Sequence, residues 1–211
     1  MEDLHDMPQS LYDGKIKKLR GKTQGQLIIK EYPTASAHSG HFKSLINELS
    51  LKKSFKPDVL FIDYLNICAS SRFKGGNISS YFYIKAIAEE LRGLAVEFDL
   101  PIFSATQTTR TGFVSTDIGL EDTSESFGIP ATADFMFALM SNEELEKLGQ
   151  MKVKQLKNRY NDPSVNRAFI IGVDRSKMRL YDVQQSSQNI VDANQVEQKE
   201  DAYNKFSDFK L

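Results

Sequence analysis

Two short runs in this chain each end in a polar side chain that suits metal or phosphate chemistry. The apolar run 59–62 is followed by Asp63, and the run 102–106 is followed by Gln107. Apolar runs without alternation are typical of parallel strands that are buried on both faces. Open α/β sheets bind ligands at the carboxyl ends of such strands, where an Asp can hold a Mg²⁺ ion and a Gln can reach a phosphate group.

Each of these two residues also has a simpler explanation. Asp63 can cap its strand and begin a turn, an explanation of at least equal weight for an apolar run followed by one Asp. Gln107 can be an ordinary loop glutamine. The occurrence of two such strand ends in one chain favours a nucleotide-hydrolysing site.

The phosphate-binding loop that would complete such a site is not found in the sequence. None of the twelve glycines fits the pattern G-x-x-x-x-G-K-[ST], whose backbone N–H groups and lysine surround the phosphates. Gly21, Lys22 and Thr23 match the last three positions, but Ile16 stands where the first glycine is required. We therefore interpret 21–23 as a turn and expect that the chain alone does not bind a nucleoside triphosphate in this manner.

The composition is that of an ordinary soluble globule. The 211 residues are 40% hydrophobic and 26% charged, with a formal net charge of −1, so any nucleic-acid contact must be local. The single cysteine, Cys68, excludes an internal disulfide. Neither a membrane span nor a secretory signal is indicated. His38 and His41 are spaced i, i+3, and surface or capping roles are favoured over zinc.

The order of elements predicts an α/β fold with a parallel sheet, because strands and helices alternate. We expect one domain over 1–183 and a polar, mostly flexible tail over 184–211. Helices are expected at 8–19, 41–53 and 78–98, and strands at 27–30, 59–63, 102–106, 135–140, 150–156 and in a hairpin of 169–173 with 178–183.

Three separated blocks of sequence carry a family resemblance. Residues 27–34, 63–68 and 130–135 occur in the same order in the RecA-like motor domain of DnaB-type hexameric replicative DNA helicases of T-even-like phages, which the chain resembles from about 11 to 183. The resemblance implies a RecA-like P-loop NTPase core with a mostly parallel sheet flanked by helices, a carboxyl-terminal β-hairpin, and no P-loop strand or helix.

The resemblance also implies roles for four residues in ATP hydrolysis. Asp63 matches the residue that holds Mg²⁺ through water, and Gln107 matches the sensor that links the γ-phosphate to the DNA-binding loops. Lys157 and Arg159 match the basic pair, arginine finger included, that one subunit inserts into its neighbour's ATP site. A solvated basic patch remains the alternative for this pair, because Lys152 and Lys154 are close in sequence.

Two loops match those that hold single-stranded DNA in the central channel of the ring. These loops are 68–77 and 108–128. The alternative for 123–128 is a short capped helix that packs Phe127 into the core, and this helix and the DNA contact can exist together. The matching residues are Arg72, Lys74, Arg110, Ser124, Glu125, Ser126, Phe127 and Gly128. The implied partners are single-stranded DNA, five further subunits of a homo-hexamer, a primase and a helicase loader, in the cytoplasm of an infected bacterial host.

The chain departs from the family in the segment that precedes residue 11. The family places a P-loop strand and helix there, followed by a helix with the catalytic glutamate. None of Glu2, Glu31, Glu89 and Glu90 stands at that glutamate's position. The P-loop strand belongs between strands 102–105 and 135–139, so we expect unpaired backbone groups and an uncovered apolar strip there.

Three origins remain open for such a chain: an incomplete gene product, a split gene whose other piece carries the P-loop, or a decayed motor. Two functions follow. The chain is the carboxyl-terminal part of an ATP-dependent replicative helicase that is inactive alone, or it is a non-catalytic adaptor that binds single-stranded DNA or a helicase ring. A nuclease that uses Asp58 and Asp63 is disfavoured, because residues five apart on a strand point to opposite faces.

Overall fold

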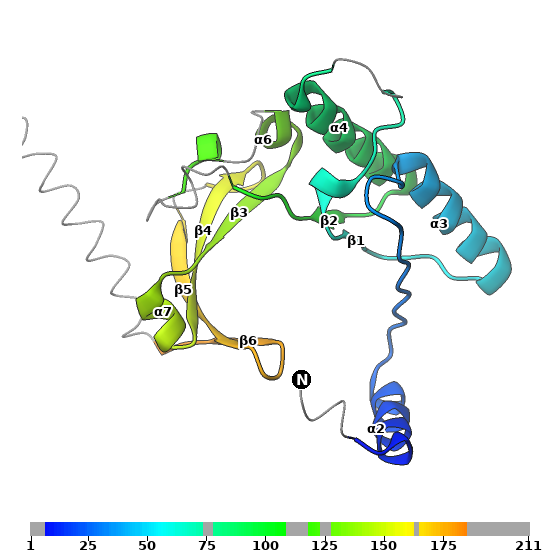
Figure 1. The fold of residues 1–211 in the computed structure, drawn as a ribbon, viewed down its shortest axis with the longest axis vertical. Coiled ribbons are helices and arrows are strands. Elements are labelled where there is room, and N and C mark those ends of the chain that lie inside the picture. The colour runs from blue at the N-terminus through cyan, green and yellow to red at the C-terminus, as the bar shows by residue number, and fades with distance from the viewer. Residues whose placement is uncertain (1–6, 74–77, 109–117, 123–127, 163–164, 185–211) are drawn as a thin grey trace, which may run out of the picture.

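The computed structural model describes residues 7–73, 78–108, 118–122, 128–162 and 165–184 (Figure 1). It is an α/β fold with two separate sheets, one parallel and one antiparallel. In chain order the elements are α2 (Gln9–Lys22), α3 (Ser39–Lys53), β1 (Leu60–Ile62), the 3-10 helix η1 (Leu65–Ile67), α4 (Ser80–Phe98), β2 (Ile102–Ser104), the 3-10 helix η2 (Leu120–Asp122), α6 (Gly128–Thr132), β3 (Phe135–Met140), α7 (Glu143–Lys147), β4 (Gln150–Asn158), β5 (Ala168–Asp174) and β6 (Arg179–Asp182).

Strands β1 and β2 form the parallel sheet that the two apolar runs predict. Leu60 pairs with Ile102 and Ile62 with Ser104, and the Ser104 hydroxyl donates to the Ile62 carbonyl at 2.9 Å. Each strand is three residues long, shorter than expected. The connection runs through α4, which is the helical crossover that a parallel pair requires.

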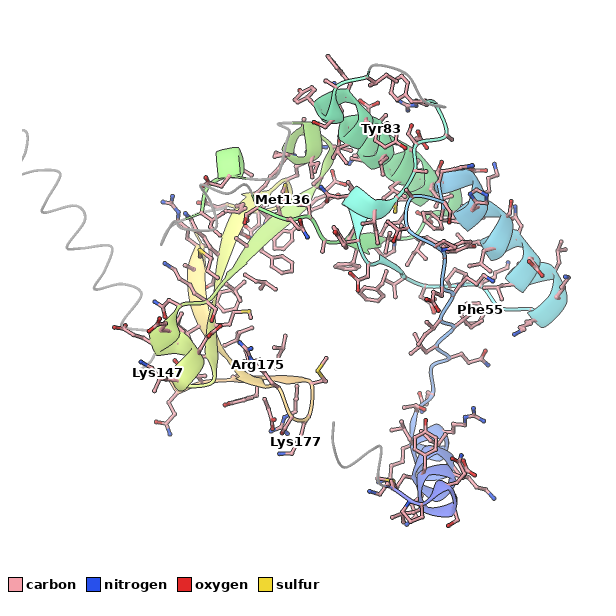
Figure 2. All side chains as sticks on the ribbon, in the orientation of Figure 1. Phe55, Tyr83, Met136, Lys147, Arg175 and Lys177 are labelled. Carbon is pink, nitrogen blue, oxygen red and sulfur yellow. The ribbon has the colours of Figure 1, made fainter. Side chains whose placement is uncertain are left out.

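Helices α3 and α4 cover one face of this pair and build the main core. The apolar stripe expected for residues 78–98 is buried, and Ile87 at its centre is 1% exposed. Phe42 of α3 and Ile62 of β1 belong to the same cluster, and Met136 of β3 packs against it (Figure 2). The core therefore extends from the parallel sheet to the first strand of the second sheet.

The two histidines act at the start of α3. The His38 ring accepts from the Gly40 N–H at 3.0 Å, and the His41 ring accepts from the His38 N–H at 3.2 Å. Together they form a reciprocal cap that satisfies two helix N–H groups. The capping role favoured from the sequence is the role observed.

The second sheet is an antiparallel meander in the order β3-β4-β5-β6. The expected hairpin is present as β5 and β6, with Asp174 opposite Arg179. Strand β4 runs to Asn158, two residues beyond the expected end, and includes Lys157. The short helix α7 between β3 and β4 was not predicted; Asn142 caps it by accepting from the Leu145 N–H at 2.8 Å.

The predicted strand at 27–30 is wrong. The segment forms no strand, and Leu27 and Ile29 are 82% and 84% exposed. A short apolar run becomes a strand only beside another strand, and no described segment pairs with this one. The preceding helix α2 stands apart from the sheets and buries none of its residues (Figure 1).

Strands β2 and β3 are not hydrogen-bonded to each other in the part of the chain that the structure describes. Large apolar side chains are exposed on both sides of this break. Phe61 and Phe103 stack at 5.3 Å between ring centroids and are 69% and 50% exposed. Phe135 and Phe137 of β3 are each 48% exposed. An uncovered apolar strip is thus observed where the sequence leads us to expect one.

Candidate functional site

The carboxyl ends of β1 and β2 meet at one edge of the parallel sheet. A hydrogen bond from the Leu65 N–H to the Ala105 carbonyl, at 3.1 Å, links the segments that follow the two strands. The Thr106 hydroxyl donates to Asn66 Oδ1 at 2.8 Å. Gln107 Nε2 donates to the Tyr64 hydroxyl at 3.3 Å, which places the Gln107 side chain beside the residue that follows Asp63. The parallel register therefore brings the Asp63 and Gln107 segments together.

Asp63 leaves its carboxylate available at the end of β1. It is exposed directly after β1, and no described residue donates a hydrogen bond to its carboxylate. The described residues contain no cluster of three or more His, Cys, Asp or Glu side chains. A lone carboxylate fits Mg²⁺, which keeps several waters and binds through one or two carboxylates plus phosphate oxygens.

Lys157 and Arg159 lie at the end of β4, where both are held against α6. Lys157 Nζ donates to the Pro130 carbonyl. Arg159 donates through Nη1 to Asp134 Oδ1 at 2.9 Å and through Nη2 to the Ala131 carbonyl at 2.8 Å. These contacts give both side chains a defined orientation.

Electrostatics at this pair reflect two arginines that share one carboxylate. Arg92 of α4 also donates to Asp134 Oδ1, at 2.8 Å. This hydrogen bond and the charges of Arg92 and Arg159 lower the pKa of Asp134. Burial, and then the nearby charge of Arg159, lower the pKa of Lys157. No described hydrogen bond or ion pair connects this pair with Asp63 or Gln107, which belong to the other sheet.

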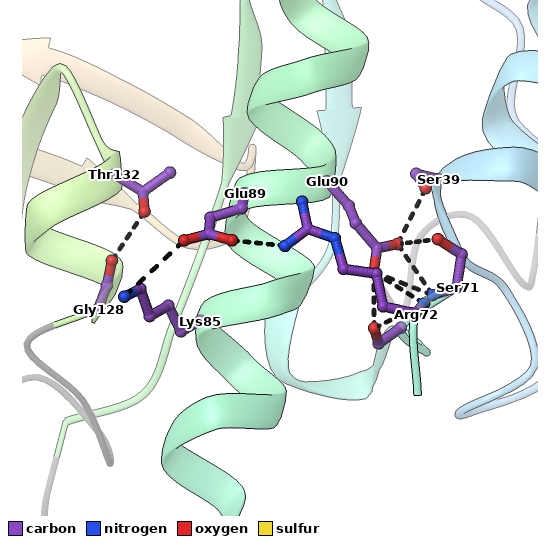
Figure 3. A network of polar contacts seen from close by, with 9 residues as sticks. Ser39, Ser71, Arg72, Lys85, Glu89, Glu90, Gly128 and Thr132 are labelled. Atoms are coloured by element: carbon purple, nitrogen blue, oxygen red, sulfur yellow. Dashed lines mark hydrogen bonds and ion pairs between the residues drawn. The ribbon is translucent and has the colours of Figure 1, made fainter. Parts of the chain in front are cut away.

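Arg72 is held by two neighbouring carboxylates of α4 (Figure 3). Its guanidinium forms an ion pair with Glu89 at 2.5 Å. Its backbone N–H donates to Glu90 Oε1 at 3.3 Å. The Glu90 carboxylate also accepts from Ser39, Ser70 and Ser71, and it is 9% exposed.

Glu90 is the site residue that sequence reasoning missed. A signal was available, because Glu90 stands one turn from Ile87 and Leu94 on the buried face of α4. A carboxylate on an apolar face needs hydrogen-bond donors. The adjacent serines 70 and 71 in the loop after β1 are natural donors.

The remaining predicted DNA-contacting residues divide into one that is described and several that are not. Gly128 begins α6, is buried, and accepts through its carbonyl from the Thr132 hydroxyl at 2.8 Å. The others lie outside the described residues: Lys74, Arg110, Ser124, Glu125, Ser126 and Phe127. Among the helices that the structure describes, none combines the length and apolar character needed to cross a bilayer.

Two solved structures share this fold. The ATPase domain of G40P matches with a TM-score of 0.59 and 18% identity, over 70% of this chain and 52% of that one. A DnaB-like replicative helicase, described in its interactions with primase, matches with a TM-score of 0.60 and 19% identity, over 72% of this chain and 36% of that one. The fold is that of a RecA-like helicase ATPase domain.

Sequence similarity is much higher to one curated protein. The chain is 42% identical over 190 residues to the DnaB-like replicative helicase of Enterobacteria phage T4, which covers 89% of this chain and 40% of that protein. The chain thus spans 40% of the length of this relative. No protein-family model matches. The resemblance to DnaB-type phage helicases is confirmed.

Proposed function

We propose that the chain is the carboxyl-terminal part of the motor of an ATP-dependent replicative DNA helicase, which unwinds duplex DNA by moving on single-stranded DNA through a hexameric ring. The observation that carries this proposal is the meeting of the Asp63 and Gln107 segments at one edge of the parallel sheet. Identity of 42% to a phage replicative helicase supports the same reading.

At the ATP site, the chain contributes the metal and sensor half. Asp63 would hold a Mg²⁺ ion at this edge of the sheet, and the ion would supply positive charge against the terminal phosphates of bound ATP. Gln107 can report the state of the γ-phosphate to the rest of the domain, because its amide already contacts Tyr64 beside Asp63. ATP and Mg²⁺ bind only when a P-loop segment from outside these 211 residues completes the site.

At the subunit interface, the chain contributes Lys157 and Arg159 to the ATP site of a neighbouring subunit. The Arg159 side chain is 43% exposed while its guanidinium is held by Asp134 and the Ala131 carbonyl. An arginine fixed in this way can meet a phosphate with little further loss of side-chain freedom. Contact with a primase is proposed from the solved DnaB-like helicase described in its interactions with primase. The homo-hexameric ring, the helicase loader and action in the cytoplasm of an infected bacterial host are proposed from the family resemblance and from the phage relative.

ATP hydrolysis by the reconstituted motor tests this function. We expect the purified chain to show no ATPase activity, and mixing with a polypeptide that carries the P-loop half to produce turnover. Arg159→Ala in the mixture should lower turnover by about a thousandfold, because the finger neutralises charge that develops on the transferred group. Single-stranded DNA binding should change little.

Arg175→Ala is the matched control, since Arg175 is an exposed arginine that pairs with Glu146 at the far end of the second sheet. Turnover by the chain alone that disappears in Asp63→Ala would contradict the expected inactivity. Intact turnover in Arg159→Ala would remove the finger assignment. Single-stranded DNA binding without turnover in any mixture would support the adaptor function instead.

A further inference from the structure

The backbone of residues 70–72 is fixed to α4 by one carboxylate. Glu90 Oε1 accepts from the Ser70 hydroxyl at 2.6 Å and from the Arg72 N–H at 3.3 Å. Glu90 Oε2 accepts from the Ser71 N–H at 2.9 Å and from its hydroxyl at 2.7 Å. The Ser39 hydroxyl at the start of α3 adds a further bond at 3.0 Å. The loop after β1 is thereby tied to two helices (Figure 3).

Contacts with residues distant in sequence hold residues 70–72 in place. Glu90 is 9% exposed on the apolar face of α4, where a carboxylate is costly unless donors surround it. The donors come from residues that are 18 to 51 positions away along the chain. Ser70 is held on its other side too, because its N–H donates to the Tyr83 hydroxyl at 3.1 Å.

The side chain of Arg72 is held by the neighbouring carboxylate. Glu89 pairs with the guanidinium at 2.5 Å, and the two side chains are 50% and 38% exposed. Lys85 lies 3.9 Å from the other oxygen of Glu89. Exposed ion pairs contribute little net free energy, so another oxyanion can replace Glu89. A phosphate group, like a carboxylate, can offer two oxygens to two N–H groups of one guanidinium.

We propose that Glu90 is a positioning residue that presents Arg72 to the phosphates of single-stranded DNA, and that Glu89 competes with those phosphates for the guanidinium. This inference rests on the proposed single-stranded DNA binding. It goes beyond that function by assigning opposite roles to two adjacent carboxylates on one helix turn.

The two roles predict opposite effects of the same isosteric change. In Glu90→Gln, an N–H₂ group replaces an acceptor oxygen that faces several donors, so residues 70–72 lose their anchor. We expect binding to weaken by about three- to tenfold, and the slope of log K against log salt to become shallower by about 0.7, the loss of one phosphate contact. In Glu89→Gln, the anchor stays and the guanidinium is released, so binding should tighten by about two- to fivefold.

The direction expected for Glu90→Gln separates positioning from general electrostatics. Removal of a negative charge, by itself, strengthens attraction to a polyanion. Glu97→Gln provides that baseline, because Glu97 is an exposed acid at the end of α4 that pairs with Lys43. It should bind as the unchanged chain does or slightly better. Only a loss of positioning makes removal of an acid weaken binding.

The experiment measures fluorescence anisotropy of a labelled oligo-dT with the whole chain and each variant over a series of salt concentrations. Amide hydrogen exchange at Ser71 and Arg72 is measured on the same samples. Weaker binding with faster exchange in Glu90→Gln, together with tighter binding in Glu89→Gln, is the expected result. If Glu90→Gln does not fold, Ser71→Ala removes one hydroxyl donor from the same carboxylate and should weaken binding by about twofold.

Two outcomes overturn the inference alone. Faster exchange in Glu90→Gln without weaker binding makes Glu90 a structural residue only, and unchanged binding in Arg72→Ala removes the contact that it positions. Absence of oligo-dT binding by the unchanged chain is a different failure, because it overturns the proposed DNA-binding function and the inference with it.

Discussion

Glu90 retains its negative charge inside the core because donors surround it. Burial raises the pKa of a carboxyl group, but the hydrogen bonds from Ser70, Ser71 and Ser39 outweigh burial and lower the pKa of Glu90 to about 2. In the unfolded chain these donors are lost and the pKa returns to about 4.5. The ionised carboxylate therefore stabilises the folded state above the unfolded pKa, and this contribution disappears as pH falls toward 2.

Glu90→Gln tests that linkage. The difference in unfolding free energy between the unchanged chain and Glu90→Gln should be largest at pH 7, about 2–3 kcal/mol, and should shrink between pH 5 and pH 2. Urea unfolding followed by circular dichroism at several pH values measures it. Glu97→Gln, on the exposed end of the same helix, should run parallel to the unchanged chain. A constant difference for Glu90→Gln across this range would show that its charge contributes no pH-dependent stability.

At the scale of elements, α4 organises the molecule. Its apolar face forms the largest part of the main core, and its polar side chains reach both the loop after β1 and the turn before β3. The helix ends at Asp99, which adopts a left-handed conformation with φ of 49° and directs the chain into β2. The parallel pairing of β1 and β2 thus depends on how α4 packs.

Ile87→Ala measures that dependence. Ile87 is the most deeply buried large side chain among the described residues, and its truncation should destabilise the fold by about 2–5 kcal/mol. Val96→Ala on the same helix is the control, because Val96 is 74% exposed and should change stability by less than about 0.5 kcal/mol. Denaturant unfolding gives both values. Similar effects of the two changes would mean that α4 is not packed as described.

The sequence predicted correctly those elements whose structure depends on residues that are close together along the chain. The spacing of the apolar residues in α4 is enough to predict its buried face. Strands β1 and β2 are linked by a single helical crossover. The segment 27–30 has strand-like residues, but a strand also needs a neighbour, which its own sequence cannot supply. Asp63 could be placed because it follows β1 directly, and Gln107 because it lies in the segment that comes just after β2. The place of Glu90 on the apolar stripe of α4 was visible in the sequence, but its set of partners was not, since Ser39, Ser70 and Ser71 are brought to it only by tertiary packing.

At the scale of the whole molecule, the break between the two sheets has a cost in solution. The exposed rings of Phe61, Phe103, Phe135 and Phe137 lie along the open edges of β2 and β3 or beside them. Exposed aromatic side chains on strands with unpaired edges favour association between chains. The chain on its own should therefore self-associate through this strip.

Replacement of Phe61 and Phe103 by Ser tests this expectation. The double variant should bind less of an apolar fluorescent dye and show a smaller apparent mass in light scattering, while its helical content stays unchanged. Phe82→Ser is the control, because Phe82 is 59% exposed and belongs to α4 and to neither sheet. Equal dye binding by the double variant and the unchanged chain would show that the strip is already covered.

The carboxylate of Asp134 connects α4 to the end of β4. Arg92 reaches it from α4 and Arg159 reaches it from the end of β4. Glu90 and Arg92 are two residues apart, which is about 3 Å along a helix axis. One short section of α4 therefore contacts two segments: the loop that carries Arg72 and, through Asp134, the turn that holds Arg159. A translation or rotation of α4 would displace Arg72 and Arg159 together.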